Sequence, residues 1–154
     1  GISNGSPVRR LIEADLDGKK VVQIGIADFS NSTGYAKRAK DFGITVIPRS
    51  ALRSRSVSDV WTEAISIAGD RVFVDFDMDV CDRSVVPACP AAAPGGISAD
   101  ELRQAANLVA QDSRVRAIDI TEIDATSDTA DGRTVRLAAL LVLEIAAGLA
   151  ASSR

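Results

Sequence analysis

Hydrophobic and polar positions follow two different rhythms along this chain. Short runs rich in Val, Ile and Phe predict β-strands, and they lie at 20–26, 44–48, 72–76 and 116–123. Longer stretches in which apolar residues recur every three or four positions predict α-helices, and they lie at 7–16, 34–42, 56–68, 98–111 and 134–149. The pattern therefore predicts about four strands that alternate with five helices.

This alternation predicts the fold class. Strands separated by helices favour a three-layer α/β/α fold with a parallel sheet. Right-handed crossovers then bring the carboxyl ends of the strands to one edge of that sheet, where such folds bind ligands. A length of 154 residues predicts a single domain over 1–154. The last helix is apolar nearly all round, which predicts that it is buried.

The most informative segment is the acidic strand VFVDFDMDVC at 72–81. Asp75, Asp77 and Asp79 are spaced two residues apart, which in an extended strand points all three carboxylates to one face. Three like charges at a buried strand are costly unless a cation lies among them. The chain contains no histidine, so an oxygen-only site would suit Mg²⁺, Ca²⁺ or Mn²⁺. The alternative is that these aspartates are solvated and accept hydrogen bonds from loop amides or a helix N-terminus.

A second acidic group lies near the end of the next predicted strand. Glu122 could converge with Asp77 and Asp79 at the same sheet edge, although acidic residues at strand ends are often only solvated. Between the two strands, the segment 82–96 contains three prolines and no periodicity, which predicts a structured and functional loop. Ser98 and Glu101 predict a capping box at the start of the helix that follows. Four further aspartates are expected as loop or cap residues, namely Asp119, Asp124, Asp128 and Asp131.

Composition narrows the classes of partner and the location. The net charge is −3 and the pI is near 5.0, and no basic stripe with aromatics is visible, so no nucleic-acid partner is expected. The first seven residues do not resemble a secretory signal, and the apolar stretch 137–150 is short for a bilayer and broken by Glu144. We therefore expect a cytoplasmic location and no membrane partner. Cys81 and Cys89 are expected to be buried free thiols.

The sequence FDMDVCD at 76–82, with PAAAPGG at 90–96, resembles the C-terminal signature of the ureohydrolases. This family comprises the arginases, agmatinases and formimidoylglutamases. VVQIGI at 21–26, DITE at 119–122 and DGRT at 131–134 extend the resemblance. It spans most of this chain but only the second half of a usual family member. It implies an arginase-like fold.

The resemblance also implies an activity and a set of site residues. Asp77 and Asp79 would help to hold a two-manganese centre, and Glu122 would be the catalytic carboxylate that binds the amidine or guanidine end of a small-molecule substrate. The implied chemistry is attack of a metal-bridging hydroxide on the amidine carbon, with release of urea or formamide. Asn4 stands where arginases carry a proton-shuttling histidine, and an amide cannot transfer that proton. Asn4 is thus a candidate substrate-binding residue, and with DGRT it favours a formimidoylglutamase or agmatinase.

The chain departs from the family in its metal motifs. The earlier motifs Gly-Gly-Asp-His and Asp-Ala-His-x-Asp do not occur here, so the chain supplies at most two of the expected metal ligands and is expected to be inactive alone. The alternative is a non-catalytic or engineered half-domain that forms homo-oligomers or binds a complementary N-terminal segment through an open strand edge. A third hypothesis is a phosphotransferase of the haloacid-dehalogenase type, whose usual hydroxyl residue is absent at Val80 and Cys81.

Overall fold

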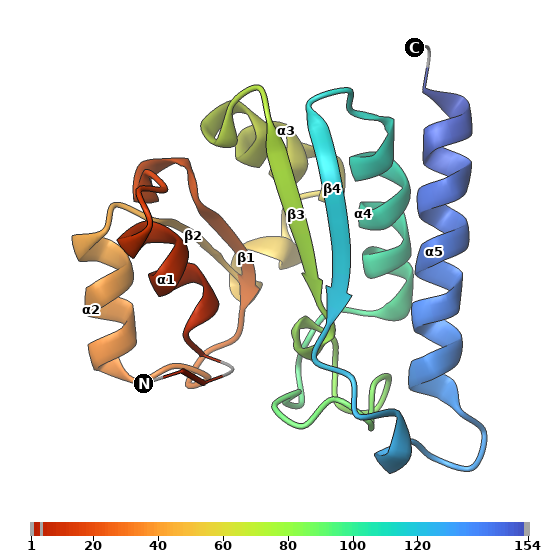
Figure 1. Ribbon diagram of the computed structural model, residues 1–154. Helices are drawn as coiled ribbons and strands as arrows, with labels where there is room; N and C mark the ends of the chain where they lie inside the picture. Colours follow the sequence, from red (N-terminus) through yellow and green to blue (C-terminus); the bar gives the residue numbers. More distant parts are fainter. Residues whose placement is uncertain (1, 4, 153–154) are drawn as a thin grey trace.

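The computed structural model describes residues 2, 3 and 5–152 (Figure 1). Strands and helices alternate along these residues as the sequence predicts. The elements in chain order are α1 (Pro7–Glu13), β1 (Val22–Ile26), α2 (Thr33–Asp41), β2 (Thr45–Pro48), α3 (Val57–Ala68), β3 (Val72–Asp77), α4 (Ala99–Gln111), β4 (Val115–Thr121) and α5 (Arg133–Ala151). Five helices and four strands within the described residues confirm the predicted α/β class.

The four strands form two parallel pairs. β1 pairs with β2, with Val22 opposite Thr45, and β3 pairs with β4, with Val74 opposite Ile118. Within the described part of the chain, no hydrogen-bonded pairing joins one pair to the other. The sequence predicts the parallel strands correctly, but it does not predict this division, because strand pairing depends on contacts that are remote in the chain.

The apolar core lies between β3–β4 and the helices α4 and α5, which run side by side (Figure 1). Twelve buried residues form it: Phe76, Met78, Cys81, Val86, Cys89, Ala92, Ile97, Leu102, Ala106, Val109, Leu137 and Leu141. α4 and α5 pack closely at Gly148, where an added Cβ would lie 2.3 Å from the carbonyl oxygen of Asn107. Glycine at this position is therefore a packing requirement.

The prediction that the last helix is buried all round is wrong. α5 places Leu137 and Leu141 against α4, but Val142 and Leu143 are 58% and 64% exposed. The 19 residues of α5 are enough, by length and composition alone, for a helix that crosses a membrane. The apolar stretch 137–150 identified from the sequence is shorter than this helix. In the structure α5 instead packs along α4 through one face, and its other face is uncovered.

Local capping signals fix several element boundaries. The predicted capping box at α4 is confirmed: the Glu101 amide donates to Ser98 Oγ (3.1 Å), and the Ser98 amide donates to Glu101 Oε2 (2.7 Å). Ser56 caps α3 in the same way. The first helix ends at Glu13 rather than at residue 16, and the backbone at Asp15 is left-handed (φ 74°). The chain turns there toward β1.

Candidate metal centre

Asp77 is the last residue of β3, and Asp79 lies beyond the strand. Asp77 Oδ1 accepts a hydrogen bond from the Asp79 amide (3.0 Å), which caps a single 3₁₀ turn at Met78–Val80. The expectation that Asp75, Asp77 and Asp79 share one face of an extended strand is therefore wrong for Asp79. An Asp side chain readily accepts an amide hydrogen bond from two residues ahead, and this local bond ends the strand.

Asp77 and Asp79 nevertheless interact electrostatically. Desolvation, together with the nearby carboxylates of Asp79, Asp75 and Glu122, raises the pKa of Asp77 to about 6, against the opposing hydrogen bond from the Asp79 amide. Desolvation and the Glu122 carboxylate also raise the pKa of Asp79, and the amides of Ala91 and Ala92 offset part of this effect. Asp77, Asp79 and Glu122 thus form one acidic cluster at the carboxyl ends of β3 and β4, as the sequence predicts.

Glu122 enters this cluster from an unusual backbone conformation. β4 ends at Thr121 rather than at residue 123, and Glu122 has a left-handed backbone with φ of 61°. The strand alternation expected for Glu122 and Ile123 therefore does not apply. A left-handed conformation is uncommon for a residue other than glycine. Two residues further on, the Asp124 amide donates to the Ala88 carbonyl oxygen (2.9 Å), which fixes the path of the chain.

The proline-rich loop 82–96 forms one wall of the cluster. It contains no helix or strand, as predicted, and a bridge between Cys81 and Ile97 closes its base. Asp82 Oδ2 accepts from the Gly95 amide (2.7 Å), and Arg83 Nη1 donates to the Cys89 carbonyl oxygen (2.6 Å). These bonds hold the loop in a shape that brings the backbone of Ala91 and Ala92 near Asp79.

The two cysteines beside the cluster are buried free thiols, as expected. Desolvation is the largest cause that raises the pKa of Cys81 and of Cys89, each to about 12. Both side chains belong to the apolar core. A thiol with so high a pKa is a poor nucleophile and a poor metal ligand at neutral pH, so the acidic cluster remains an oxygen site.

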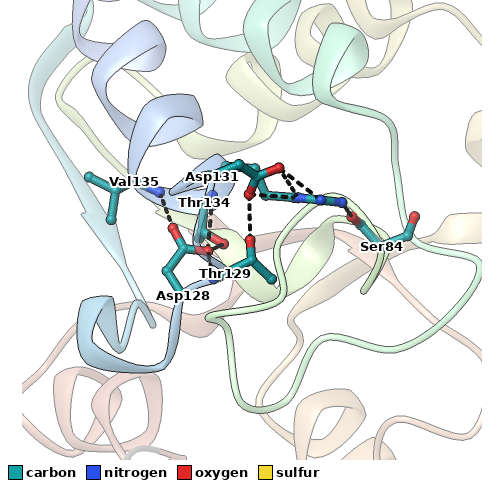
Figure 2. Close-up of polar contacts among 7 residues, drawn as sticks. Ser84, Asp128, Thr129, Asp131, Thr134 and Val135 are labelled. Atoms are coloured by element: carbon teal, nitrogen blue, oxygen red, sulfur yellow. Dashed lines mark hydrogen bonds and ion pairs between the residues drawn. The ribbon is translucent and has the colours of Figure 1, made fainter.

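Thr134 connects the start of α5 to the loop. Its buried Oγ1 donates to Asp128 Oδ1 (2.9 Å) and accepts from the Ala88 amide (3.1 Å). Asp128 Oδ2 also accepts from the Val135 amide (3.0 Å), so Asp128 caps α5 (Figure 2). The sequence predicts Asp128 as a loop or cap residue, but it gives no signal for the role of its partner Thr134 beyond the DGRT segment.

Asp131 and Arg133 form a second connection in the same region. Asp131 accepts from Arg133 Nη2 (2.8 Å) and from Thr129 Oγ1 (2.6 Å), and Arg133 Nη1 donates to the Ser84 carbonyl oxygen (3.3 Å) (Figure 2). The hydrogen bonds from Arg133 and Thr129 lower the pKa of Asp131 to about 2. The DGRT segment thus acts structurally, by joining α5 to the loop that borders the acidic cluster.

Comparison with known proteins identifies the family. The sequence profile described as the arginase family matches residues 1–148. This chain belongs to the arginase family. Formimidoylglutamase from Bacillus subtilis (strain 168) is 36% identical over 153 residues, which cover 97% of this chain and 48% of that enzyme. Agmatinase from Cronobacter sakazakii is 31% identical over 135 residues, covering 86% of this chain and 40% of that enzyme.

Solved structures agree with this assignment. The crystal structure of B. subtilis formimidoylglutamase superposes with a TM-score of 0.93 and 35% identity, over 99% of this chain and 48% of that chain. A structure of Trypanosoma cruzi formiminoglutamase with Mn²⁺ superposes with a TM-score of 0.92, at 22% identity, over 98% of this chain and 50% of that chain. This arginase-family chain therefore has the arginase fold and spans about half the length of the relatives it matches.

The acidic cluster offers carboxylate oxygens as ligands to a cation but does not surround it. Asp79 Oδ1 is buried and has no hydrogen-bond partner, which is costly for a carboxylate unless a positive group meets it. No group of three or more His, Cys, Asp or Glu side chains that could hold a metal occurs among the residues that the structure describes. Asp77 and Asp79 therefore fit a hard cation but leave most of its coordination sites open. Asn4 lies outside the described residues.

Proposed function

We propose that this chain is part of a manganese-dependent ureohydrolase that cleaves a C–N bond in a linear amidine or guanidine. The observation that carries the proposal is the acidic cluster, in which the Glu122 carboxylate raises the pKa of Asp77 and Asp79 and Asp79 Oδ1 is buried without a hydrogen-bond partner. Family membership supports the proposal, because the similar proteins are named formimidoylglutamases and agmatinase. A cation beside these carboxylates would stabilise their charged forms, which the neighbouring negative charges disfavour.

Asp77 and Asp79 are proposed to hold Mn²⁺. Both offer carboxylate oxygens, and the thiols nearby are too weakly acidic to compete. When bound, the metal would supply an activated water and polarise the amidine group. The residues of this chain keep the site in place: the backbone amide of Asp79 donates to the Asp77 carboxylate and holds it, and the loop amides orient the Asp79 carboxylate.

Glu122 is proposed to bind and orient the substrate. A carboxylate can accept two parallel hydrogen bonds from a planar amidinium or guanidinium cation, which fixes its plane as well as its position. The left-handed backbone at Glu122 turns the chain at the end of β4, where the cluster lies. Asn4 remains a candidate for substrate contact, and its amide would orient the substrate rather than transfer a proton.

The proposed substrate class is that of formimidoylglutamase, with agmatinase as the second candidate. Several formimidoylglutamases match more than nine-tenths of this chain, and the agmatinase matches 86% of it. Hydrolysis of a formimidoyl group releases formamide, whereas hydrolysis of a guanidine releases urea, so product analysis separates them. The expected partner is a small molecule, and the expected location is the cytoplasm.

We expect these 154 residues to be inactive alone. Two carboxylates leave a hard cation with most of its six or more ligands missing. The alternative function, an oligomerising structural module, is favoured by one observation: the uncovered face of α5 exposes Val142 and Leu143. The two functions make different predictions about metal binding.

Mn²⁺ titration of the purified chain tests the proposed function. Isothermal titration calorimetry should detect weak binding that is lost in Asp77→Asn, because that variant removes one of the two proposed ligands. Asp70→Asn, at the opposite end of β3, is the matched control and should bind like the parent. Release of formamide or urea should be undetectable for the chain alone. Equal Mn²⁺ binding by the parent and Asp77→Asn would reject the proposal.

A further inference from the structure

The proline-rich loop 82–96 contains a tight turn over residues 89–92. The Ala92 amide donates to the Cys89 carbonyl oxygen (3.2 Å), and this bond closes a four-residue turn. Pro90 occupies the second position of the turn, where its fixed φ angle is favoured. The closing bond does not use the amide of the third residue, Ala91, so the turn can present this amide to a group outside itself.

Arg83 holds this turn from one side. Its Nη1 donates to the Cys89 carbonyl oxygen (2.6 Å) and to the Pro90 carbonyl oxygen (3.2 Å). The Arg83 amide also donates to the Ala93 carbonyl oxygen (3.2 Å), just beyond the turn. Hydrogen bonds from a guanidinium are stronger than those from a neutral donor, and its planar shape restricts their directions. One residue therefore contacts the turn at its start, at its centre and just after its end.

Asp79 lies on the other side of the turn. The peptide bond between Pro90 and Ala91 is trans, so its carbonyl group points toward Arg83 while its amide points the opposite way. The amides of Ala91 and Ala92 lower the pKa of Asp79, as amides beside a carboxylate do. Arg83 and Asp79 thus face opposite sides of the same peptide group.

The orientation of the Asp79 carboxylate matters because one of its oxygens is available to a cation. Asp79 Oδ1 is buried and has no hydrogen-bond partner. The plane of a carboxylate rotates easily unless neighbouring groups fix it. Groups that hold a metal-binding carboxylate in place, without touching the metal, typically change metal affinity by about 10–100-fold. A residue that fixes the loop amides beside Asp79 should therefore influence cation binding.

We propose that Arg83 is a positioning residue for the metal-binding carboxylate of Asp79, and that it acts by holding the turn at 89–92. The inference rests on the proposed function, which supplies the metal. The charge of Arg83 works against its positioning role, because a guanidinium near the site repels a cation. The guanidinium lies close enough to Asp79 to lower the pKa of that carboxyl. Loss of the charge alone would tighten Mn²⁺ binding, whereas loss of the positioning bonds would weaken it.

The sign of the change in Mn²⁺ affinity tests the proposal. Electron paramagnetic resonance measures free Mn²⁺, and at pH 8 the carboxylates of the cluster are ionised. Arg83→Gln should bind Mn²⁺ about tenfold more weakly than the parent. Arg133→Gln is the matched control, because it removes the same charge and a bond to another loop carbonyl, that of Ser84, outside the turn. Its affinity should stay within about twofold of the parent. Unchanged or tighter binding by Arg83→Gln would overturn the proposal.

A measurement without metal separates this inference from the proposed function. Asp79→Asn removes the charge beside the Ala91 amide and should shift the nuclear magnetic resonance signal of that amide. In the Arg83→Gln background the same replacement should shift it by about half as much or less, because the turn no longer holds the amide against residue 79. The Ala88 amide, which donates to Thr134, is the internal reference. A parent that binds no Mn²⁺ would refute the proposed function, whereas equal shifts in both backgrounds would overturn the role of Arg83.

Discussion

The β3–β4 pair and the β1–β2 pair belong to the same fold but bury very different amounts of side chain. The β3–β4 region, with α4, α5 and the proline-rich loop, contributes all twelve residues of the main apolar cluster. In the β1–β2 region, neither α1 nor α2 contains a buried residue, and the strands bury only Gly25 and Ile47. One region carries its own core, whereas the other depends on contacts outside itself.

This difference predicts which region unfolds more easily. Hydrophobic burial supplies most of the free energy of folding, so a region with few buried side chains should open at little cost. The β1–β2 region is held by α3 and by the contact of Gly25 with Val80.

The largest expected effect comes from emptying the core of the β3–β4 region. Leu141→Ala should lower the free energy of unfolding by about 2–5 kcal/mol, because Leu141 is fully buried and its removal leaves a cavity. Leu11→Ala in α1 removes a side chain that is 51% exposed and should change it by about 0.5 kcal/mol or less. Urea unfolding of both variants measures the difference. Equal losses would refute the contrast between the regions.

The next largest effect should come from the connection between α5 and the loop. Thr134→Val keeps the shape of the side chain but leaves the buried Ala88 amide without its acceptor and removes one of the hydrogen bonds to Asp128. The expected loss is about 1–3 kcal/mol, the cost of an unsatisfied buried polar group. Thr62→Val, on the exposed side of α3, is the control and should stay within about 0.5 kcal/mol of the parent. Thermal unfolding of the two variants decides between a structural and a dispensable role.

The acidic cluster should make the well-packed region less stable as the pH rises. The folded-state pKa of Asp77 is about 6, against 3.8 for an unperturbed carboxyl, so between these values the folded chain holds a proton that the unfolded chain has released. Stability is therefore lost as the pH rises through this window. Without metal, Asp77→Asn should be more stable than the parent above pH 6, by about 1 kcal/mol after solvent screening. At pH 3 the parent and Asp77→Asn should have equal free energies of unfolding. A difference that persists at pH 3 would show that it does not come from the charge on Asp77.

The smallest effect should have the opposite pH dependence. Asp131 has a pKa of about 2 in the folded chain, below 3.8, so its bonds to Arg133 and Thr129 stabilise the fold above pH 3.8. That contribution is lost as the pH falls toward 2. Asp131→Asn should therefore be slightly less stable than the parent at pH 7 and equal to it near pH 2. Chemical unfolding between pH 2 and pH 7 measures the stability difference between Asp131→Asn and the parent. A difference that grows on acidification would exclude the Asp131–Arg133 ion pair as its cause.

Local sequence signals predict much of this fold. The capping box at Ser98 predicts the exact residue at which α4 begins, because the Ser98 side chain and an amide three positions later determine that start. The β-branched runs locate all four strands within a few residues of their observed ends. Glu122 and the two aspartates come together as expected, because parallel strands end at one edge.

Non-local contacts explain what the sequence does not predict. The hydrogen bond between Asp77 and the Asp79 amide competes with the strand and removes Asp79 from it. The burial of α5 depends on what covers its second face, and its composition does not contain that information. The division into two strand pairs depends on backbone pairing between strands that are remote in the chain. The role of Thr134 depends on Ala88, 46 residues away.

The left-handed backbone at Glu122 places two selective pressures on one residue. A glutamate in this conformation costs about 1–2 kcal/mol that a glycine would not. Selection for stability alone would thus favour glycine or asparagine at this position, and the carboxylate would be lost. A chain that keeps glutamate here forgoes an easy gain in stability, which is the trade-off expected where chemistry rather than folding governs the choice of residue.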